Sequence, residues 1–145
     1  MIGLDRSVQL VCETRSWLAF FPDEPATPGH TLVVPRRHVT DLWEATTDEA
    51  VALTAGAVRV GRSIQAVLNP DGMNLITSAG RAAEQSVFHL HLHVVPRWRR
   101  DGFGQIWPKE HRYEDAALTN VAGEIRAVCQ EGERDGLPRD WSPEG

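Results

Sequence analysis

One stretch, residues 88–95, alternates apolar side chains with histidines. Such alternation is typical of a β-strand, in which successive side chains point to opposite faces. We therefore predict a strand with three imidazoles on one face, about 6.6 Å apart, since each residue advances about 3.3 Å. The histidines of this strand are His89, His91 and His93, and the apolar residues of its other face are Phe88, Leu90, Leu92 and Val94.

Three imidazoles in this arrangement could serve one of two kinds of chemistry, or none if they form a solvated surface. A zinc ion could bind two of them, but three ligands spread over about 13 Å cannot all reach one ion at about 2 Å. The other chemistry is nucleophilic catalysis. The ordinary pKa of histidine is about 6.5, so neutral imidazole is available at pH 7, and flanking histidines disfavour a positive charge on the central ring. A neutral imidazole can attack phosphorus and form a covalent intermediate.

Two predicted hairpins would position the histidines. Residues 17–21 and 30–35 are apolar runs separated by a loop with three prolines and a glycine, which predicts a first hairpin. Residues 73–78 and 88–95 are predicted to form a second hairpin around the small-residue loop 79–86. Such a loop can direct backbone N–H groups into a concavity and hold phosphate without lysine side chains.

The clearest predicted helix begins after Thr46. Thr46 and Glu49 have the spacing of a capping box, in which each side chain accepts a hydrogen bond from the other residue's backbone N–H. Apolar residues then recur at helical spacing as far as Leu68, and the turn-forming residues 69–72 end the pattern. We expect this helix to pack on the sheet through its apolar face.

These elements predict an α+β fold in a single domain spanning residues 1–145. The strands group into antiparallel pairs without regular βαβ alternation, so we expect an antiparallel sheet of two hairpins with the long helix packed on one face. The histidines would lie on the open face. A C-terminal helix is expected over about residues 114–130 and an irregular tail over residues 131–145. Residues 8–12 fit either a helical turn or an edge strand.

Composition narrows the expected partners and location. The formal net charge is −5, so the molecule as a whole does not suit a polyanion such as nucleic acid. Cys12 and Cys129 lie far apart and form no Cys-x-x-Cys pair, which is typical of a reducing compartment. No apolar run approaches the roughly 20 residues of a membrane helix, and the N-terminus lacks a signal-peptide pattern. We therefore expect a cytoplasmic protein without a membrane partner.

Two groups of basic residues can be interpreted in more than one way. Arg36, Arg37 and His38 follow a predicted strand and could contact phosphate, although charged strand ends usually face water. Residues 97–100, Arg-Trp-Arg-Arg, could form a rim that attracts phosphates or caps a base by stacking. They could equally form a solvated turn around a packed Trp98.

The histidine stretch resembles the signature of the histidine triad (HIT) superfamily of nucleotide hydrolases and transferases. The sequence His89-Leu90-His91-Leu92-His93-Val94-Val95 matches the family pattern His-x-His-x-His-x-x, in which x is apolar. Residues 28–38 resemble the family's upstream strand, residues 85–88 its approach to the triad, and residues 96–97 its exit. The resemblance covers about residues 17–98 and implies a HIT-like fold.

The resemblance also implies an activity and partners. A purine nucleotide substrate would be attacked at its α-phosphate to give a covalent nucleotidyl-histidine, which water or phosphate would resolve. No cofactor and no metal ion is expected, and the Cys-x-x-Cys of zinc-binding relatives is absent. Family members usually form homodimers through the long helix, and the small residues Ala57 and Gly61 would permit this contact. Trp107 and His111 could then reach the site of the partner.

Individual roles follow from the same resemblance. His91 would be the nucleophile, and His89 would orient His91 or neighbouring groups, with its backbone carbonyl as one route. His93 would contact the phosphate or the leaving group, and His30 would lie beside the triad. The phosphate-binding positions would be Gln85, Ser86 and Ser78, and the ribose- or base-binding positions would be Phe20, Asp23, Glu24 and Trp98.

Three positions depart from the family pattern and bear on the substrate. Ser78 stands where an asparagine is common, Glu84 where a glycine precedes the glutamine, and Pro22 where an acidic residue usually holds the ribose. Asp23 or Glu24 would then take the place of that acid. The leaving group stays open between P–N and P–O–P substrates. A dinucleoside polyphosphate phosphorylase, a nucleotide-binding regulatory module with vestigial turnover and a zinc protein also stay open.

Overall fold

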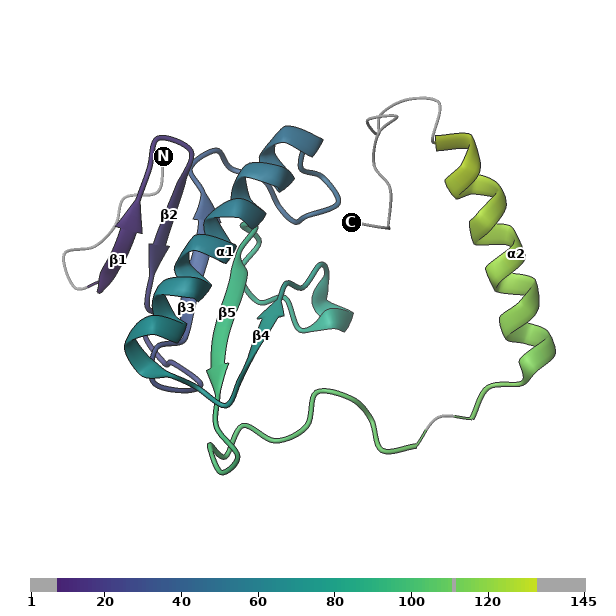
Figure 1. The fold of residues 1–145 in the computed structure, drawn as a ribbon. Coiled ribbons are helices and arrows are strands. Elements are labelled where there is room, and N and C mark those ends of the chain that lie inside the picture. Colours follow the sequence, from purple (N-terminus) through teal and green to yellow (C-terminus); the bar gives the residue numbers. More distant parts are fainter. Residues whose placement is uncertain (1–7, 111, 133–145) are drawn as a thin grey trace. The chain divides into compact units, whose positions relative to one another are not determined.

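The computed structural model describes residues 8–110 and 112–132 of the 145-residue chain. The chain divides into two compact units, the first ending at Gly104 and the second beginning at Gln105, and each is described by itself (Figure 1). Within the described residues no helix is long and apolar enough to cross a membrane.

The first unit is built on a five-stranded antiparallel sheet with the strand order β1-β2-β3-β5-β4. The predicted hairpins are both present, since β2 pairs with β3 and β4 pairs with β5, and a β3–β5 pairing joins them. β1 adds an edge strand where the sequence allowed a turn or a strand. The predicted α+β class is confirmed. The strands are β1 (Leu10–Glu13), β2 (Trp17–Phe20), β3 (Thr31–Pro35), β4 (Gly72–Ile76) and β5 (Leu92–Arg97).

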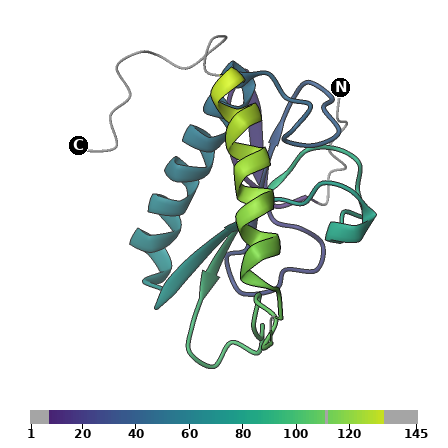
Figure 2. The same ribbon diagram turned by 90° about the vertical axis from the view of Figure 1, so that its right-hand side faces the viewer.

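The helix α1 (Thr47–Leu68) lies along one face of this sheet (Figures 1 and 2). Its predicted capping box is present, because the Thr46 side chain accepts from the Glu49 N–H and the Glu49 carboxylate accepts from the Thr46 N–H. The helix ends at Asn69, whose left-handed backbone lets its N–H donate to the Gln65 carbonyl. The predicted helix is therefore confirmed at both ends.

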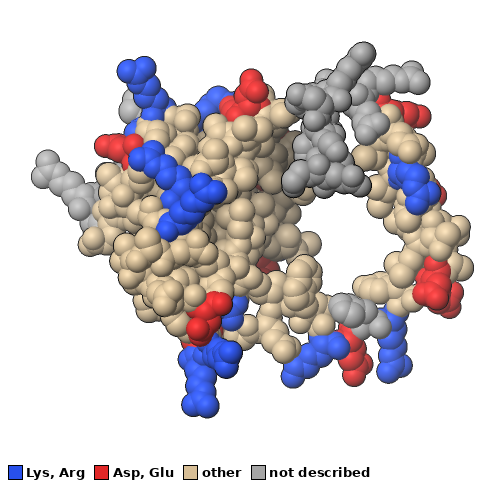
Figure 3. Space-filling model, in the orientation of Figure 1, with Lys and Arg blue, Asp and Glu red and all other residues tan. Residues whose placement is uncertain are grey.

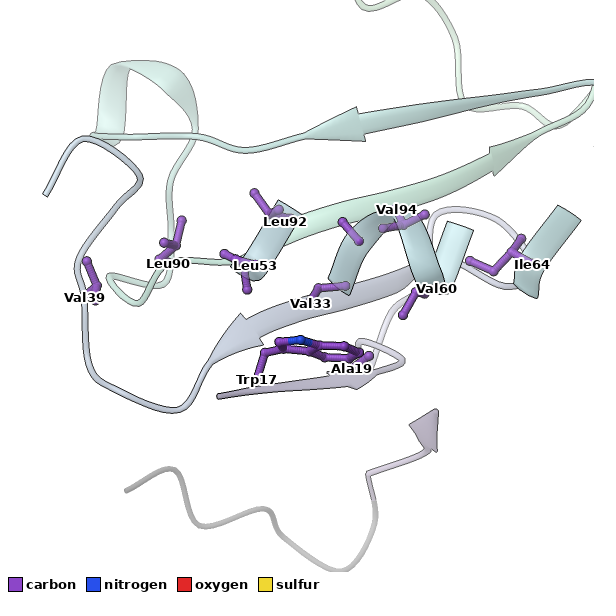
Figure 4. Packing of buried hydrophobic residues seen from close by; sticks show 11 residues of the cluster. Trp17, Ala19, Val33, Val39, Leu53, Val60, Ile64, Leu90, Leu92 and Val94 are labelled. Atoms are coloured by element: carbon purple, nitrogen blue, oxygen red, sulfur yellow. The ribbon is translucent and has the colours of Figure 1, made fainter. Parts of the chain in front are cut away.

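The core lies between α1 and the sheet, as Figure 4 shows. Burial of this apolar surface at about 25 cal/mol per Å² is what holds the helix on the strands. The residues labelled there come from β2 and β3 (Trp17, Ala19, Val33), from β5 (Leu92, Val94), from α1 (Leu53, Val60, Ile64) and from two loops (Val39, Leu90).

The histidine stretch differs from the prediction at its start. The strand β5 begins at Leu92, whereas a strand from Phe88 was expected. The Leu90 N–H bonds to the Val39 carbonyl of a loop, so residues 88–91 leave the ladder. Leu90 is buried as predicted, but Phe88 is 39% exposed and lies beneath the Arg81 guanidinium, 5.2 Å from the ring centroid. The prediction that Phe88 joins the core face is therefore wrong.

Two other boundaries shift by a few residues. β4 ends at Ile76, and the loop that follows contains a single 3₁₀ turn, η1 (Arg81–Ala83). In the second unit the C-terminal helix is α2 (Asp115–Gly132), so residues 131–132, expected to be irregular, continue the helix. The rest of the expected tail, residues 133–145, lies outside the described residues.

The small residues of α1 face the protein's own sheet. Ala57 is only 3% exposed, and a Cβ on Gly61 would lie 3.7 Å from the side chains of Met73 and Val94. The expectation that Ala57 and Gly61 form a dimer surface is therefore wrong, because the sheet already covers them. Gly56 packs even more closely, since a Cβ there would lie 2.6 Å from Cε2 of Trp17.

The two glycines predict opposite effects of the same substitution. Alanine is favoured over glycine inside a helix by about 1 kcal/mol, so Gly61→Ala should raise the free energy of unfolding by up to that amount. Gly56→Ala should instead lower it by about 1–2 kcal/mol, because overpacking against the buried Trp17 exceeds the gain in helix propensity. Urea unfolding of both variants measures the difference, and a shift in the same direction for both would contradict the packing argument.

Candidate active site

Five histidines form a continuous series of contacts around the start of β5. His91 occupies the centre, and its Nδ1 lies 2.7 Å from the backbone carbonyl oxygen of His89. A carbonyl only accepts hydrogen bonds, so Nδ1 of His91 carries the proton and Nε2 of the neutral ring keeps its lone pair. The ring is partly exposed, and no hydrogen bond from the described residues occupies Nε2. Nε2 is therefore the nitrogen of this ring that has a free lone pair.

His93 and His30 form the pair next to it. The ring of His93 stands edge-on to that of His91 with the centroids 4.8 Å apart, and His93 Nδ1 lies 2.9 Å from His30 Nε2. The Ala26 N–H donates to His30 Nδ1 over 3.0 Å, so the proton of neutral His30 sits on Nε2 and is donated to His93. His93 must then carry its own proton on Nε2. A backbone amide thereby sets the tautomers of both rings.

Burial keeps this pair uncharged at neutral pH. Loss of solvation lowers the pKa of His93 to about 4, and the neighbouring His91 and His30 act in the same direction. The pKa of buried His30 is lowered as well, first by burial and then by His91. At pH 7 His93 is therefore a neutral N–H donor beside His91.

On the other side of His91, the ring of His89 turns away from the cluster. Its Nε2 donates to the Pro35 carbonyl over 3.0 Å, and its Nδ1 lies 3.0 Å from Nδ1 of His38. Burial lowers the pKa of His89, and the charges of His38 and His91 lower it further, while its bond to Pro35 opposes the shift. The three triad histidines therefore do not all point into one open face, as a straight strand would require.

The loop after β4 is held by Gln85. Its side-chain oxygen accepts from the Gly80 N–H over 2.8 Å, and its amide nitrogen donates to the Thr40 and Val87 carbonyls over 2.8 and 3.2 Å. The side chain is buried and engaged at both ends. The predicted phosphate contact of Gln85 would require replacement of one of these bonds, so the structure gives this residue a supporting position.

The neighbouring serines are more accessible. Ser86 directly follows Gln85 and is exposed, and Ser78 is partly exposed at the start of the same loop. Neither hydroxyl makes a hydrogen bond to other residues in the part of the chain that is described. Both are therefore available to an anion, although they line a loop and not the histidine cluster itself.

The predicted base- and ribose-binding residues fall in two places. Phe20 pairs with Leu32, and Leu32 pairs with His93, so their side chains form one cross-strand row on a single face of the sheet. Asp23 and Glu24 are exposed in the loop after Phe20, the same loop whose Ala26 amide holds His30. Phe20 therefore lies on the face of His93, two strands away, and no bond from Asp23 or Glu24 to the histidines is present in the described residues.

Trp98 lies at the other end of β5. It follows His93 by five residues, about 17 Å along an extended strand. The basic residue before it, Arg97, is bound to Asp101 and Asn74 and lies over the Phe103 ring, so it anchors a turn. The structure does not bring Trp98 to the histidines of its own chain. Of the residues expected to reach a partner's site, Trp107 belongs to the second unit and His111 lies outside the described residues.

The remaining sequence alternatives can be placed as well. Arg36 bonds to the Thr14 carbonyl and to Glu13, and Arg37 pairs with Glu49 of α1, so both are held within the fold. Among the described residues no group of three or more His, Cys, Asp or Glu side chains is arranged to hold a metal ion.

Three contributors to the site are not indicated by the sequence pattern. His38 reaches His89, the Ala26 amide fixes His30, and the Thr77 hydroxyl donates to the His91 carbonyl over 2.9 Å. Thr77 therefore holds the backbone of the nucleophile from β4's side of the sheet. Thr77 could have been predicted, because the expected hairpin places it opposite the histidines. Ala26 could not, because it acts through its backbone and its side chain gives no indication of the contact.

Comparisons with known proteins agree with this geometry. A family model described as HIT domain matches residues 5–100. The Bacillus subtilis (strain 168) protein named "Protein hit" is 36% identical over 118 residues, which cover 79% of this chain and 81% of that protein. Among solved structures, a HIT family protein from Bacillus anthracis has a TM-score of 0.75 at 36% identity, with 83% of this chain and 87% of that chain covered.

A further solved structure, of a Streptococcus mutans UA159 protein, has a TM-score of 0.77 at 34% identity and covers 84% of this chain and 77% of its own. The family match spans the sheet, α1 and all five described histidines. The α+β topology found here is shared with these neighbours. The chain therefore belongs to the HIT family, a superfamily of nucleotide-binding hydrolases and transferases.

Proposed function

We propose that the protein is a nucleotide hydrolase or nucleotidyltransferase that attacks the α-phosphate of a nucleotidyl substrate through His91. The observation that carries this proposal is the bond from His91 Nδ1 to the His89 carbonyl, which leaves the Nε2 lone pair as the nucleophile. An imidazole held in one tautomer, with a free Nε2 lone pair beside the neutral donor His93, suits attack on phosphorus.

The reaction has two displacement steps. In the first, the Nε2 lone pair of His91 forms a bond to the α-phosphorus, and the P–N or P–O bond to the leaving group breaks with its electron pair going to that group. The positive charge that develops on the imidazole is stabilised by the His89 carbonyl at Nδ1. An amine leaving group takes up a proton from solvent. In the second step, water or inorganic phosphate attacks the phosphorus, an attacking water loses a proton to solvent, and the N–P electron pair returns to His91.

His93 supplies the donor for the phosphoryl group. Its Nε2–H is fixed by the bond from His30 to its Nδ1, and its lowered pKa keeps it neutral at pH 7. A neutral donor can hold a non-bridging oxygen or serve the leaving group without titrating near neutrality. The hydroxyls of Ser86 and Ser78 extend the expected anion-binding surface.

The row formed by Phe20, Leu32 and His93 supports a purine base beside the phosphate. An apolar row that ends in the imidazole cluster offers the base a surface for stacking while the phosphate reaches His91. Asp23 or Glu24, in the loop after Phe20, would hold the ribose hydroxyls. The cytoplasmic location expected from the sequence stays a prediction.

A homodimer is part of the same proposal. Besides its buried face, α1 carries exposed apolar residues such as Val51, which is 62% exposed. Together with Trp43 of the preceding loop, which is 81% exposed, they border a groove of about 660 Å³. In the view of Figure 3, where α1 lies in front of the sheet, much of the surface is uncharged and charges of both signs are scattered. A second copy can therefore approach this face without strong like-charge repulsion, in a symmetric contact. The groove is lined by Leu42, Trp43, Ala45, Val51, Ala55 and Val58, among others.

His91→Ala should abolish covalent labelling of the protein by a nucleotidyl substrate radiolabelled in its α-phosphate, because the substitution removes the nitrogen that is proposed to attack the phosphorus. Ser63→Ala, an exposed position on α1, serves as the matched control and should label like the wild type. Circular dichroism checks that both variants fold. Persistent labelling of the His91→Ala protein would exclude His91 as the nucleophile.

A substrate panel separates the remaining activities. It contains adenosine and guanosine phosphoramidates, diadenosine polyphosphates and adenylylsulfate, each with and without inorganic phosphate. Faster turnover with phosphate would identify a phosphorylase, and tight nucleotide binding without turnover of any compound would favour a regulatory module. Metal analysis of the purified protein tests the zinc alternative.

The lowered pKa of His93 predicts a fall in stability on acidification. Unfolded His93 takes up a proton near its ordinary pKa of about 6.5, whereas the folded pKa is about 4. Protons therefore favour the unfolded state in this window, so the stabilisation is complete above pH 6.5 and is lost as the pH falls towards 4. In thermal unfolding between pH 7 and 4.5, the melting temperature of His93→Asn should fall less than that of the wild type. His30 and His89, whose pKa values are also lowered, account for the fall that persists in the variant. Equal slopes would contradict the assignment.

Trp43→Asp should convert a dimer into a monomer. A carboxylate placed in the apolar contact loses its hydration, which should weaken the dimer by at least about a hundredfold. Val67→Asp, at an exposed apolar position of α1 outside the groove, is the matched control and should leave the dimer intact. Sedimentation equilibrium distinguishes the two states. A monomeric wild-type protein, or equal disruption by both substitutions, would contradict this interface.

A further inference from the structure

One short segment, residues 35–39, makes two contacts with the His89 ring and one with the peptide group that joins His89 to Leu90. The Pro35 carbonyl accepts from Nε2 of the His89 ring, and His38 Nδ1 lies 3.0 Å from its Nδ1. The Val39 carbonyl accepts from the Leu90 N–H over 2.6 Å. The segment is itself fixed, because the Val39 side chain is buried at one end of the core beside Leu90 (Figure 4).

The Leu90 N–H and the His89 carbonyl belong to the same peptide group. In a planar trans peptide these two groups point in opposite directions. The bond to Val39 therefore aims the His89 carbonyl away from that loop, towards Nδ1 of His91. The position of Val39, which does not itself face the expected phosphate, thus sets the orientation of the His91 ring.

The direction of the His38–His89 bond follows from the other bonds. Because Nε2 of His89 donates to a carbonyl, Nδ1 of the neutral ring has no proton and can only accept. His38 must therefore donate through its Nδ1–H. Of the three contacts from residues 35–39, the His38 contact is made by a side chain, whereas Pro35 and Val39 act through their backbone carbonyls.

We propose that His38 is a positioning residue for the nucleophile: its bond fixes the His89 ring, as the Val39 bond fixes the His89–Leu90 peptide, and the two bonds together hold the carbonyl that sets the tautomer and direction of His91. The inference rests on the proposed function, in which His91 is the nucleophile. His38 is exposed and follows two arginines that are bound elsewhere in the fold, and its ring makes this one hydrogen bond within the described residues. It touches neither the reacting atoms nor the expected base-binding row.

His38→Ala should slow formation of the nucleotidyl-His91 intermediate by about five- to tenfold, the effect expected from loss of one such hydrogen bond. The substrate KM should change little, because His38 does not contact substrate. His38→Asn should restore most of the rate, since the asparagine amide places an N–H donor near the position of Nδ1. Arg36→Ala, next in the same segment but bound to Glu13 and Thr14, should match the wild type.

Single-turnover labelling measures these rates, and ¹⁵N spectra of the histidine rings measure the tautomers independently of activity. The wild-type spectrum should show His91 as the Nδ1–H tautomer alone, and His38→Ala should show a mixture that His38→Asn removes. An unchanged rate and tautomer in His38→Ala, or no rescue by asparagine, would overturn the positioning role. If the wild type forms no intermediate, the proposed function fails, and the ring spectra still decide whether His38 sets the tautomer of His91.

Discussion

The hydrogen bond from His91 Nδ1 to the His89 carbonyl is the interaction on which the site depends. It decides which nitrogen carries the lone pair, and without it either tautomer would be available. The same carbonyl could not serve if residues 88–91 stayed in the sheet, because a neighbouring strand would then compete for it. The break in the strand before Leu92 therefore leaves one backbone acceptor free for Nδ1 of His91.

The cluster has a single arrangement of protons because the tautomer of each ring is fixed by a backbone group, either directly or through a neighbouring ring. The Ala26 amide sets His30, and His30 in turn sets His93, while the Pro35 carbonyl sets His89. Burial adds to this order, since it lowers the pKa of His30 and His93 and keeps both neutral at pH 7. An anionic phosphoryl group would thus meet fixed neutral donors whose orientation needs no rearrangement during the reaction.

Local patterns were enough to predict the elements but not the partners of the histidines. The capping box at Thr46 and the periodicity of α1 are local signals, and each hairpin is marked by its own turn. Alternation at residues 88–91, by contrast, looks the same in a strand and in an extended loop. His38 and Val39 are some 50 residues from His89 in sequence, so their contacts depend on how the hairpins pack and not on any local propensity.

The loop after β4 shows how a departure from the family pattern is tolerated. Glu84 has a left-handed backbone with φ 66°, a conformation that costs a residue with a side chain about 1–2 kcal/mol relative to glycine. The loop nonetheless closes through its neighbours, since the Gln85 N–H bonds to the Gly80 carbonyl and the Gly80 N–H bonds to the Gln85 side chain. Because these bonds do not involve the Glu84 side chain, this residue can be substituted without loss of the loop structure. Its charge lies beside Ser86 in the exposed loop, and none of the described hydrogen bonds of the histidine cluster involves it.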